Sequence, residues 1–142
     1  MDVTNLVCLQ QFCSKCDNIP NIEQDFIKCG KSKHSFWDDP VGDMLSYMCE
    51  SRPWVEMIIV IAHNARAYDL HFILNRGILL KWNVKLIVNG MKIMCMRTAH
   101  LVFLDSISFL PFALCKLPGP LRITVTKFCY THYFNTQAKL TM

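Results

Sequence analysis

An aspartate follows a strongly apolar run in this sequence and opens the next periodic segment. Residues 57–62 read MIIVIA, a turn of five residues comes next, and Asp69 lies at the start of a stretch with apolar residues at helical spacing. In open α/β sheets, ligands collect beyond the carboxyl ends of strands, where a carboxylate can hold a divalent ion that activates water and clamps phosphate. A carboxylate here can also serve the helix alone, because it favours the positive end of the helix dipole. Asp69 is therefore either a metal ligand or a helix-capping residue.

A second group of candidate ligands lies in the polar segment 13–34. Cys13 and Cys16 are separated by two residues, which places two thiolates on one turn, and Cys29 and His34 could complete a tetrahedral Cys₃His zinc site. The alternative is a leftover loop with free thiols, because ligand spacing in a loop is easily met by chance.

Whether the cysteines form disulfides depends on whether the protein is secreted, which the start of the chain indicates. The first residues, MDVTN, have no basic region or cleavage site typical of a signal peptide. We therefore expect an intracellular, non-secreted protein in which the eight cysteines are mostly reduced. In that setting closely spaced cysteines favour metal binding over disulfides.

The elements that must position these residues follow from periodicity and turn signals. A mixed α/β sheet with at least one strand-helix-strand crossover is predicted. Asp39 and Pro40 mark a helix start, Gly77 a helix end, and Asn89-Gly90 a hairpin turn with two positive φ angles. The strand at 57–62 is expected to be central and buried on both faces. Predicted strands cover 5–12, 57–62, 84–88, 91–96 and 101–105; predicted helices cover 40–49 and 68–76; residues 13–34 are expected to form a loop or insertion, Pro118-Gly119-Pro120 to break regular structure, and 127–142 to be irregular.

Length and composition bound the function. With 142 residues, 52% of them hydrophobic and 18% charged, the chain suffices for one domain with a core. The net charge of +4 is compatible with nucleic acid but does not argue for it alone. No membrane partner is expected, because the longest apolar run, 57–62, is far shorter than the roughly 20 residues that a span needs.

The spacing Asn64-x-x-x-Tyr68-Asp69 is followed, in order, by four further recognisable blocks. These are 87–94 (IVNGMKIM), 103–111 (FLDSISFLP), 116–118 (KLP) and 132–136 (HYFNT). Together the blocks resemble the 3′→5′ exonuclease domain of protein-primed family-B DNA polymerases of the Maverick/Polinton and viral kind, and the first is similar to the second exonuclease motif of that family. A lone match of this kind would be weak, whereas collinear blocks over about residues 5–136 are specific.

The resemblance implies roles for particular residues. It implies that Asp69 is one of four carboxylates that bind two Mg²⁺ or Mn²⁺ ions, and that Asn64 and Tyr68 touch a single-stranded primer end. It also implies that Ser106 contacts single-stranded DNA or the priming protein, with Ile107 in place of the usual Leu. An aromatic side chain suits this role, because every base has a π-face on which it can stack.

The departures from the family pattern limit what the chain can do. The first exonuclease motif, Asp-x-Glu, is absent and expected upstream of Met1, while the third is expected beyond Met142. One carboxylate cannot hold two ions on the order of 3.5–4 Å apart, so the isolated chain is expected to be inactive. Related polymerases often carry a cysteine where this chain has Phe26, which implies a damaged or rebuilt zinc knuckle.

The whole-chain hypothesis is thus an incomplete RNase H-like exonuclease domain with a Cys-rich insertion, a fragment of a nuclear or viral-factory DNA polymerase. Two alternatives stay open. One is a non-catalytic zinc- or nucleic-acid-binding module built on the cysteines and the positive charge. The other is a degenerate transposon relic without function.

Overall fold

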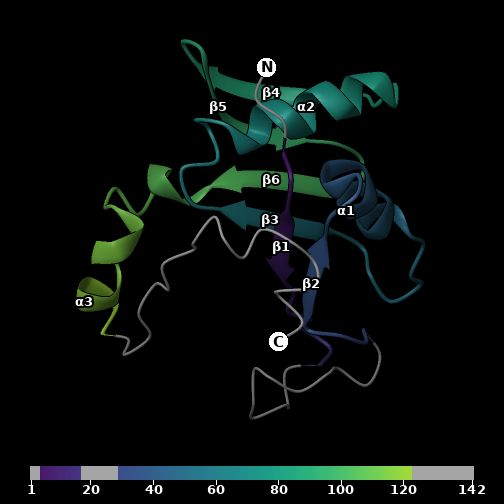
Figure 1. Cartoon of the computed structure of the whole chain (residues 1–142), viewed down its shortest axis with the longest axis horizontal. Helices are drawn as coiled ribbons and strands as arrows, with labels where there is room; N and C mark the ends of the chain where they lie inside the picture. The colour runs from purple at the N-terminus through teal and green to yellow at the C-terminus, as the bar shows by residue number, and fades with distance from the viewer. Residues whose placement is uncertain (1–3, 17–28, 123–142) are drawn as a thin grey trace.

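The chain forms a mixed α/β structure, shown in Figure 1 as a computed structural model that describes residues 4–16 and 29–122. The prediction of a mixed sheet flanked by helices is confirmed. The elements, in chain order, are β1 (Val7–Gln10), β2 (Lys33–Phe36), α1 (Pro40–Cys49), β3 (Ile58–Ala62), α2 (Asp69–Leu79), β4 (Lys85–Asn89), β5 (Lys92–Arg97), β6 (Leu101–Asp105), two 3₁₀ turns (Ser106–Ser108 and Leu114–Lys116) and α3 (Pro118–Leu121).

The four-stranded sheet has the order β3-β6-β5-β4. Strands β3 and β6 are parallel, and the remaining pairs are antiparallel. The chain leaves β3, passes through α2 and the β4–β5 hairpin, and returns as β6 beside its starting strand. This is the expected crossover, and it brings the carboxyl ends of β3 and β6 together at one edge.

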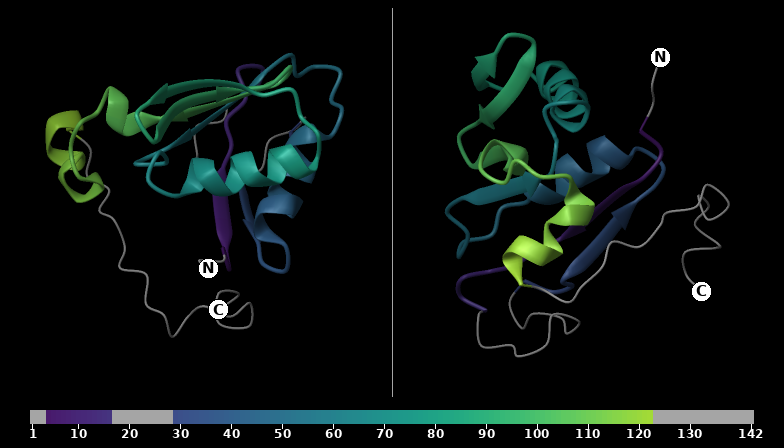
Figure 2. Two further views of the ribbon diagram at one scale, coloured as in Figure 1. Left: turned by 90° about the horizontal axis from the view of Figure 1, so that it is seen from above. Right: turned by 90° about the vertical axis from the view of Figure 1, so that its left-hand side faces the viewer.

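The core lies between this sheet and the two helices. Figure 2 shows α1 and α2 on the same face of the sheet, with α1 also lying against the separate β1–β2 ribbon. The ribbon adds Val7, Leu9 and Phe36 to the edge of the core. The centre of the core is apolar and fully buried, and consists of Leu45, Leu70, Met96, Leu101 and Phe103.

Strand β3 differs from its prediction as a central strand buried on both faces. It lies at the edge of the sheet, and Ile59 and Ile61 are 58% and 59% exposed. Their partners across β6 are Val102 and Leu104, so these side chains share the face that α1 and α2 do not cover. The β-branched run therefore identified a strand but not its position, because periodicity cannot distinguish a doubly covered strand from one with a bare face.

Helix α2 also continues past its predicted end. It runs to Leu79, so Gly77 lies inside the helix and not at its terminus. A Cβ at Gly77 would lie 3.1 Å from the Trp82 ring, so the glycine provides space for this aromatic side chain. The chain leaves the helical conformation at Lys81, which has a φ of 56°.

The hairpin is confirmed, but its turn is shifted by one residue. Asn89 still pairs with Lys92, so Gly90 and Met91 form the turn, and of these two only Gly90 has a positive φ, 60°. A glycine with positive φ at the first turn position is typical of a type II′ hairpin, whereas the predicted turn required two positive φ angles.

Two further predictions about irregular segments are wrong. The end of the expected 13–34 loop forms β2, because the chain there pairs with β1 in the register Leu9 to His34. Pro118-Gly119-Pro120 lies in the short helix α3, where a proline at the first position costs no hydrogen bond. The predicted irregular tail, the block 132–136 and Phe26 lie outside the described residues.

Among the described helices, none has the length and apolar character that a bilayer crossing requires.

The start of α1 generates a prediction about stability. Asp39 accepts a hydrogen bond from the Gly42 N–H at 3.4 Å and forms an ion pair with Arg76 of α2, so it both caps one helix and ties it to the next. We expect Asp39→Ala to lower the free energy of unfolding by about 1 kcal/mol, the usual value of an N-cap. Urea denaturation measures this change.

The neighbouring Asp38 provides the control. It is exposed and makes no ion pair within the described part of the chain. Asp38→Ala should leave the unfolding midpoint unchanged. Equal midpoints for both variants would show that the cap contributes nothing.

Candidate nucleic-acid site and candidate metal centre

Asp69 lies where the sequence predicted, beyond the carboxyl end of β3 and in the first turn of α2. The helix-dipole interpretation therefore applies to it. Its carboxylate, however, makes no hydrogen bond or ion pair within the described residues, whereas Asp39 at the start of α1 caps its helix directly. Asp69 is thus a carboxylate at the strand ends that the fold leaves available.

A second carboxylate, Asp105, ends the neighbouring strand β6 and is fully buried. Its oxygens accept hydrogen bonds from the backbone N–H of Arg66 at 3.2 Å and of Ile107 at 3.1 Å, and the Arg66 side chain lies 3.5 Å away as an ion pair. Asp105 therefore fixes the turn that follows its own strand. Asp105 also fixes the turn that precedes Asp69.

The electrostatic environment of Asp69 reflects this neighbour. Although Asp69 is an exposed residue, the protein removes part of the water around its carboxyl, and this desolvation raises its pKa above the usual value of 3.8. The negative charge of Asp105 raises the pKa of Asp69 further. A nearby cation would offset both costs, which is the physical basis for considering metal binding here.

The structure places the other predicted DNA-contacting residues around this end of the sheet. Asn64 is exposed and has a φ of 61°, and Tyr68, at the N-cap of α2, is 65% exposed. The Tyr68 ring is therefore accessible for stacking. Ile107, which follows β6, is partly buried.

Ser106 occupies a more enclosed position, since it is 7% exposed. Its hydroxyl lies 2.9 Å from Nδ1 of His63, while Nε2 of His63 lies 2.7 Å from the Phe112 carbonyl. That carbonyl can only accept, so Nε2 carries a proton. The Ser106 hydroxyl has one proton, which it can donate to Nδ1 of the neutral imidazole or to the Ala62 carbonyl at 3.5 Å. A contact of this hydroxyl with DNA requires this hydrogen bond to open, so the predicted role of Ser106 stays a prediction.

Metal ligands gather at a different place, on the segments that flank the β1–β2 ribbon. The Sγ atoms of Cys13, Cys16 and Cys29 all lie within 4.8 Å of one another, and those of Cys16 and Cys29 are 3.9 Å apart. Zn–S bonds of about 2.3 Å in a tetrahedron separate sulfurs by about 3.8 Å, so this spacing is suitable for one ion. Cysteines 13, 16 and 29 are free thiols, and together they could hold a metal such as zinc.

His34 does not join this cluster. It lies on β2 with its Nε2 donating to the Lys31 carbonyl at 2.9 Å and its ring 4.3 Å from that of Tyr47. The predicted Cys₃His set is therefore reduced to three thiols, because strand pairing turns His34 toward α1. In the described part of the chain this is the single group of three or more potential metal ligands, and no carboxylate cluster for a pair of Mg²⁺ or Mn²⁺ ions is found there.

Two of the thiols, Cys13 and Cys29, differ in acidity. Burial opposes ionisation of Cys13, but hydrogen bonds from the Lys15 and Cys16 backbone and from the Cys29 and Cys16 thiols outweigh it, so the pKa of Cys13 lies below its usual value of 9.0. Burial raises the pKa of Cys29, against the lowering effect of the Trp54 indole, and the two other thiols raise it further. Of these two thiols, Cys13 therefore ionises more readily.

The residues that support these two sites were not found by sequence reasoning. Arg66 stood in the motif turn without an assigned partner. Trp54 contacts the Cys29 thiol, Gln11 contacts the Cys29 carbonyl and Tyr47 contacts Gln11, and no spacing signal connects these residues. They come from different elements, so their contacts exist only in the folded chain.

A cavity of about 390 Å³ lies beside Trp82 and His100 at the amino ends of β3 and β6, at the opposite end of the sheet from Asp69.

Comparison of the chain with protein-family models, with curated proteins and with solved structures gives no significant match. The fold and the sites themselves therefore define the class: a mixed α/β protein with an available carboxylate at the strand ends and a cluster of three cysteines.

The raised pKa of Asp69 predicts a pH-dependent cost of its charge. The folded chain holds the Asp69 proton more tightly than the unfolded chain does. Protonated Asp69 therefore stabilises the fold fully below pH 3.8, and this contribution to the free energy of unfolding is lost as the pH rises through the folded pKa. Asp69→Asn cannot ionise, so at pH 7 we expect it to unfold with a free energy up to about 0.5 kcal/mol above that of the wild type. Urea denaturation at pH 7 and near pH 4 should show the difference shrinking on acidification, and a difference that grows instead would contradict this explanation.

The thiol cluster predicts a metal stoichiometry. We expect wild-type protein purified under reducing conditions to bind about one zinc per chain, Cys16→Ser to lose it, and His34→Ala to retain it. Elemental analysis of the dialysed proteins measures this. Loss of zinc from His34→Ala as complete as from Cys16→Ser would restore His34 as a ligand, and zinc-free wild type would reject the site.

Proposed function

We propose that this chain is part of the 3′→5′ exonuclease region of a family-B DNA polymerase, in which Asp69 holds a divalent cation beside a single-stranded primer end. The observation that carries the proposal is the position of the Asp69 carboxylate. It lies beyond the carboxyl ends of the parallel pair β3–β6, has no protein partner in the described chain, and follows an exposed tyrosine. The ordered sequence blocks give the proposal its family.

The chemistry of the site supports this choice. A hard divalent cation such as Mg²⁺ or Mn²⁺ prefers oxygen ligands. It would offset both the desolvation that raises the pKa of Asp69 and the negative charge of Asp105 that raises this pKa further. The Tyr68 ring offers a stacking surface for a base, and the exposed Asn64 amide can bond to a base or a sugar. A phosphate between them would complete the coordination of the ion.

The topology supports an incomplete RNase H-like domain as the finer fold assignment. Parallel pairing of β3 with β6, the crossover through α2 and the antiparallel β4–β5 hairpin are compatible with such a sheet. The partners that follow from the proposal are DNA and, by resemblance, a priming protein, in a nucleus or a viral factory.

The proposal includes binding and not catalysis by the chain alone. Two-metal hydrolysis needs both ions clamped by several carboxylates. The nearest second carboxylate, Asp105, is occupied by Arg66 and two backbone N–H groups. Asp69 alone can hold one ion against a phosphate. It cannot hold the two ions between which an attacking water would be activated.

A second candidate function, a metal-binding module, is favoured by a separate observation. The cluster of Cys13, Cys16 and Cys29 is independent of Asp69, since it lies on the segments that flank the β1–β2 ribbon and not at the four-stranded sheet. A bound zinc would fix the segments on either side of residues 17–28. This role is compatible with the first, because a structural metal can support a nucleic-acid-binding domain.

The DNA proposal predicts which side chains bind a single strand. Fluorescence anisotropy with a labelled oligonucleotide that has a free 3′ end, in Mn²⁺ or in EDTA, measures the two contributions separately. We expect Tyr68→Ala to weaken binding by about 1–3 kcal/mol in both buffers, the usual value of one stacked base. Asp69→Asn should remove the part of the affinity that depends on Mn²⁺.

Matched variants make the test specific. Tyr68→Phe retains the ring and should bind like the wild type, and Asp38→Asn changes an exposed carboxylate elsewhere and should keep the Mn²⁺ effect. No shortening of the oligonucleotide is expected. An Asp69→Asn protein whose affinity still rises with Mn²⁺ as in the wild type would refute the proposal.

A further inference from the structure

The side chain of Gln11 joins the thiol cluster to helix α1. Its Nε2 donates to the carbonyls of Cys29 at 2.9 Å and Lys31 at 2.7 Å, and its Oε1 accepts from the Tyr47 hydroxyl at 2.6 Å. Both amide protons and the amide oxygen are therefore engaged. The Gln11 backbone N–H also donates to the Ser32 carbonyl at 2.8 Å, so this one residue restrains the whole segment from Cys29 to Ser32.

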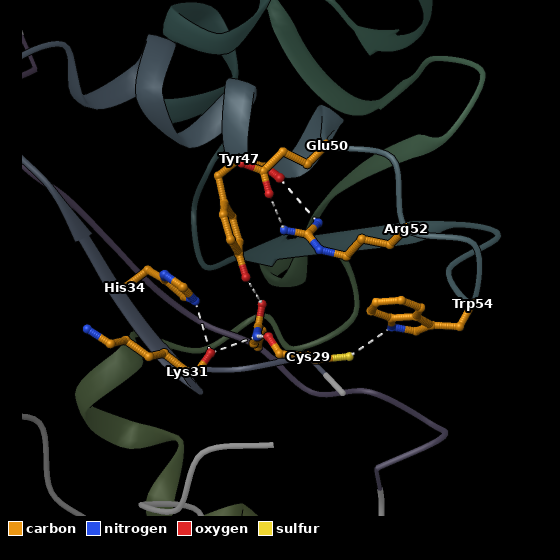
Figure 3. A network of polar contacts seen from close by, with 8 residues as sticks. Cys29, Lys31, His34, Tyr47, Glu50, Arg52 and Trp54 are labelled. Carbon is orange, nitrogen blue, oxygen red and sulfur yellow. Dashed lines mark hydrogen bonds and ion pairs between the residues drawn. The ribbon is translucent and has the colours of Figure 1, made fainter. Parts of the chain in front are cut away.

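Tyr47 is itself held firmly on α1, as Figure 3 shows. The His34 ring lies 4.3 Å from its ring, and the Arg52 guanidinium carbon lies 4.6 Å from the ring centre. Arg52 also donates to the Tyr47 carbonyl at 3.2 Å and pairs with Glu50 at 3.0 Å. These contacts fix the direction of the phenol hydroxyl, which in turn orients the Gln11 amide.

Cys29 is restrained at its sulfur as well as at its carbonyl. The Trp54 indole Nε1–H donates to Sγ of Cys29 at 3.3 Å, and Figure 3 shows the Trp54 and Cys29 side chains pointing toward each other. Gln11 and Trp54 together therefore restrain Cys29 at its carbonyl and at its sulfur.

We propose that Gln11 is a positioning residue that couples metal binding at Cys13, Cys16 and Cys29 to the packing of the β1–β2 ribbon on α1. The inference rests on the second candidate function, in which these thiols bind a thiophilic divalent ion such as Zn²⁺. The three sulfurs already lie within 4.8 Å of one another. Gln11 holds the Cys29 carbonyl, and with it the Cys29 thiol, in the place where the ion binds. Tyr47 acts through Gln11 and touches no ligand itself.

The coupling has a physical reason. Residues 29–32 join the Cys29 ligand to β2, so any displacement of this segment moves a ligand sulfur and the strand together. Partners that orient metal ligands without touching the metal typically contribute 10–100-fold to affinity. Metal that binds the folded chain and not the unfolded chain also raises stability, and the size of this gain follows the affinity.

The experiment measures Co²⁺ affinity by thiolate-to-metal absorption and Zn²⁺ affinity by competition, using the full chain under reducing conditions. The informative variant is Gln11→Met, which keeps the size of the side chain and removes its hydrogen bonds. We expect about 10–100-fold weaker binding. Tyr47→Phe, which loses only the hydroxyl, should weaken binding in the same direction by a smaller factor.

Further variants separate positioning from general stability. Gln10→Ala changes the exposed neighbouring glutamine and should bind metal like the wild type. The double variant Gln11→Met/Tyr47→Phe should bind no more weakly than Gln11→Met alone, because the hydroxyl acts through the amide. Circular dichroism at the titration temperature confirms that each protein is folded, and if Gln11→Met is not, Tyr47→Phe against Gln10→Ala decides the question.

The outcomes distinguish the positioning role of Gln11 from the metal-binding function on which it rests. Wild-type protein that binds no Co²⁺ through its thiols rejects both the metal function and the positioning role, and leaves the DNA proposal untouched. Wild-type binding together with unchanged affinity in folded Gln11→Met and Tyr47→Phe overturns the positioning role alone.

Discussion

The buried carboxylate of Asp105 is the interaction on which the candidate nucleic-acid site depends. It lies at the end of β6 and binds two backbone N–H groups, one in the turn after β3 and one in the turn after its own strand. A buried charge without partners would be strongly unfavourable, so these contacts and the Arg66 side chain must form together with the fold. The parallel pairing of β3 with β6 and the position of Asp69 follow from the same contacts.

The two candidate sites use opposite solutions to the problem of placing a ligand. Asp69 lies on the first turn of a helix that packs on the main sheet, and no residue of 4–16 or 29–122 pairs with its carboxylate. The thiols lie on segments with little regular structure. Gln11, directly after β1, and Trp54, in the loop before β3, restrain Cys29, and Tyr47 of α1 holds Gln11. A helix packed on the sheet thus fixes the position of the Asp69 carboxylate, while a hydrogen-bond network fixes the position of the Cys29 thiol.

The sequence predicted the features that depend on local signals. The Asp39-Pro40 start fixed α1, the apolar run identified β3, and the glycine after Asn89 located the hairpin, since each reflects backbone or periodicity constraints that act over a few residues. The three cysteines were also found, because two of them share a short spacing. Long-range facts were not accessible, such as the bare face of β3, the pairing that turns His34 away, and the Trp82 ring that requires Gly77 inside a helix.

The uncovered face of the sheet has a consequence for the behaviour of the isolated chain. Ile61, Leu104, Cys95 and Ile87 lie in one row across all four strands, and none of them carries charge. The outer edge of β3 is equally uncharged, whereas β4 at the other edge begins with a lysine. Natural edge strands use charge, proline or bulges to prevent aggregation, and β3 has none of these within Ile58–Ala62. The edge of β3 and the apolar face beside it therefore favour pairing between copies of this chain as the protein concentration rises.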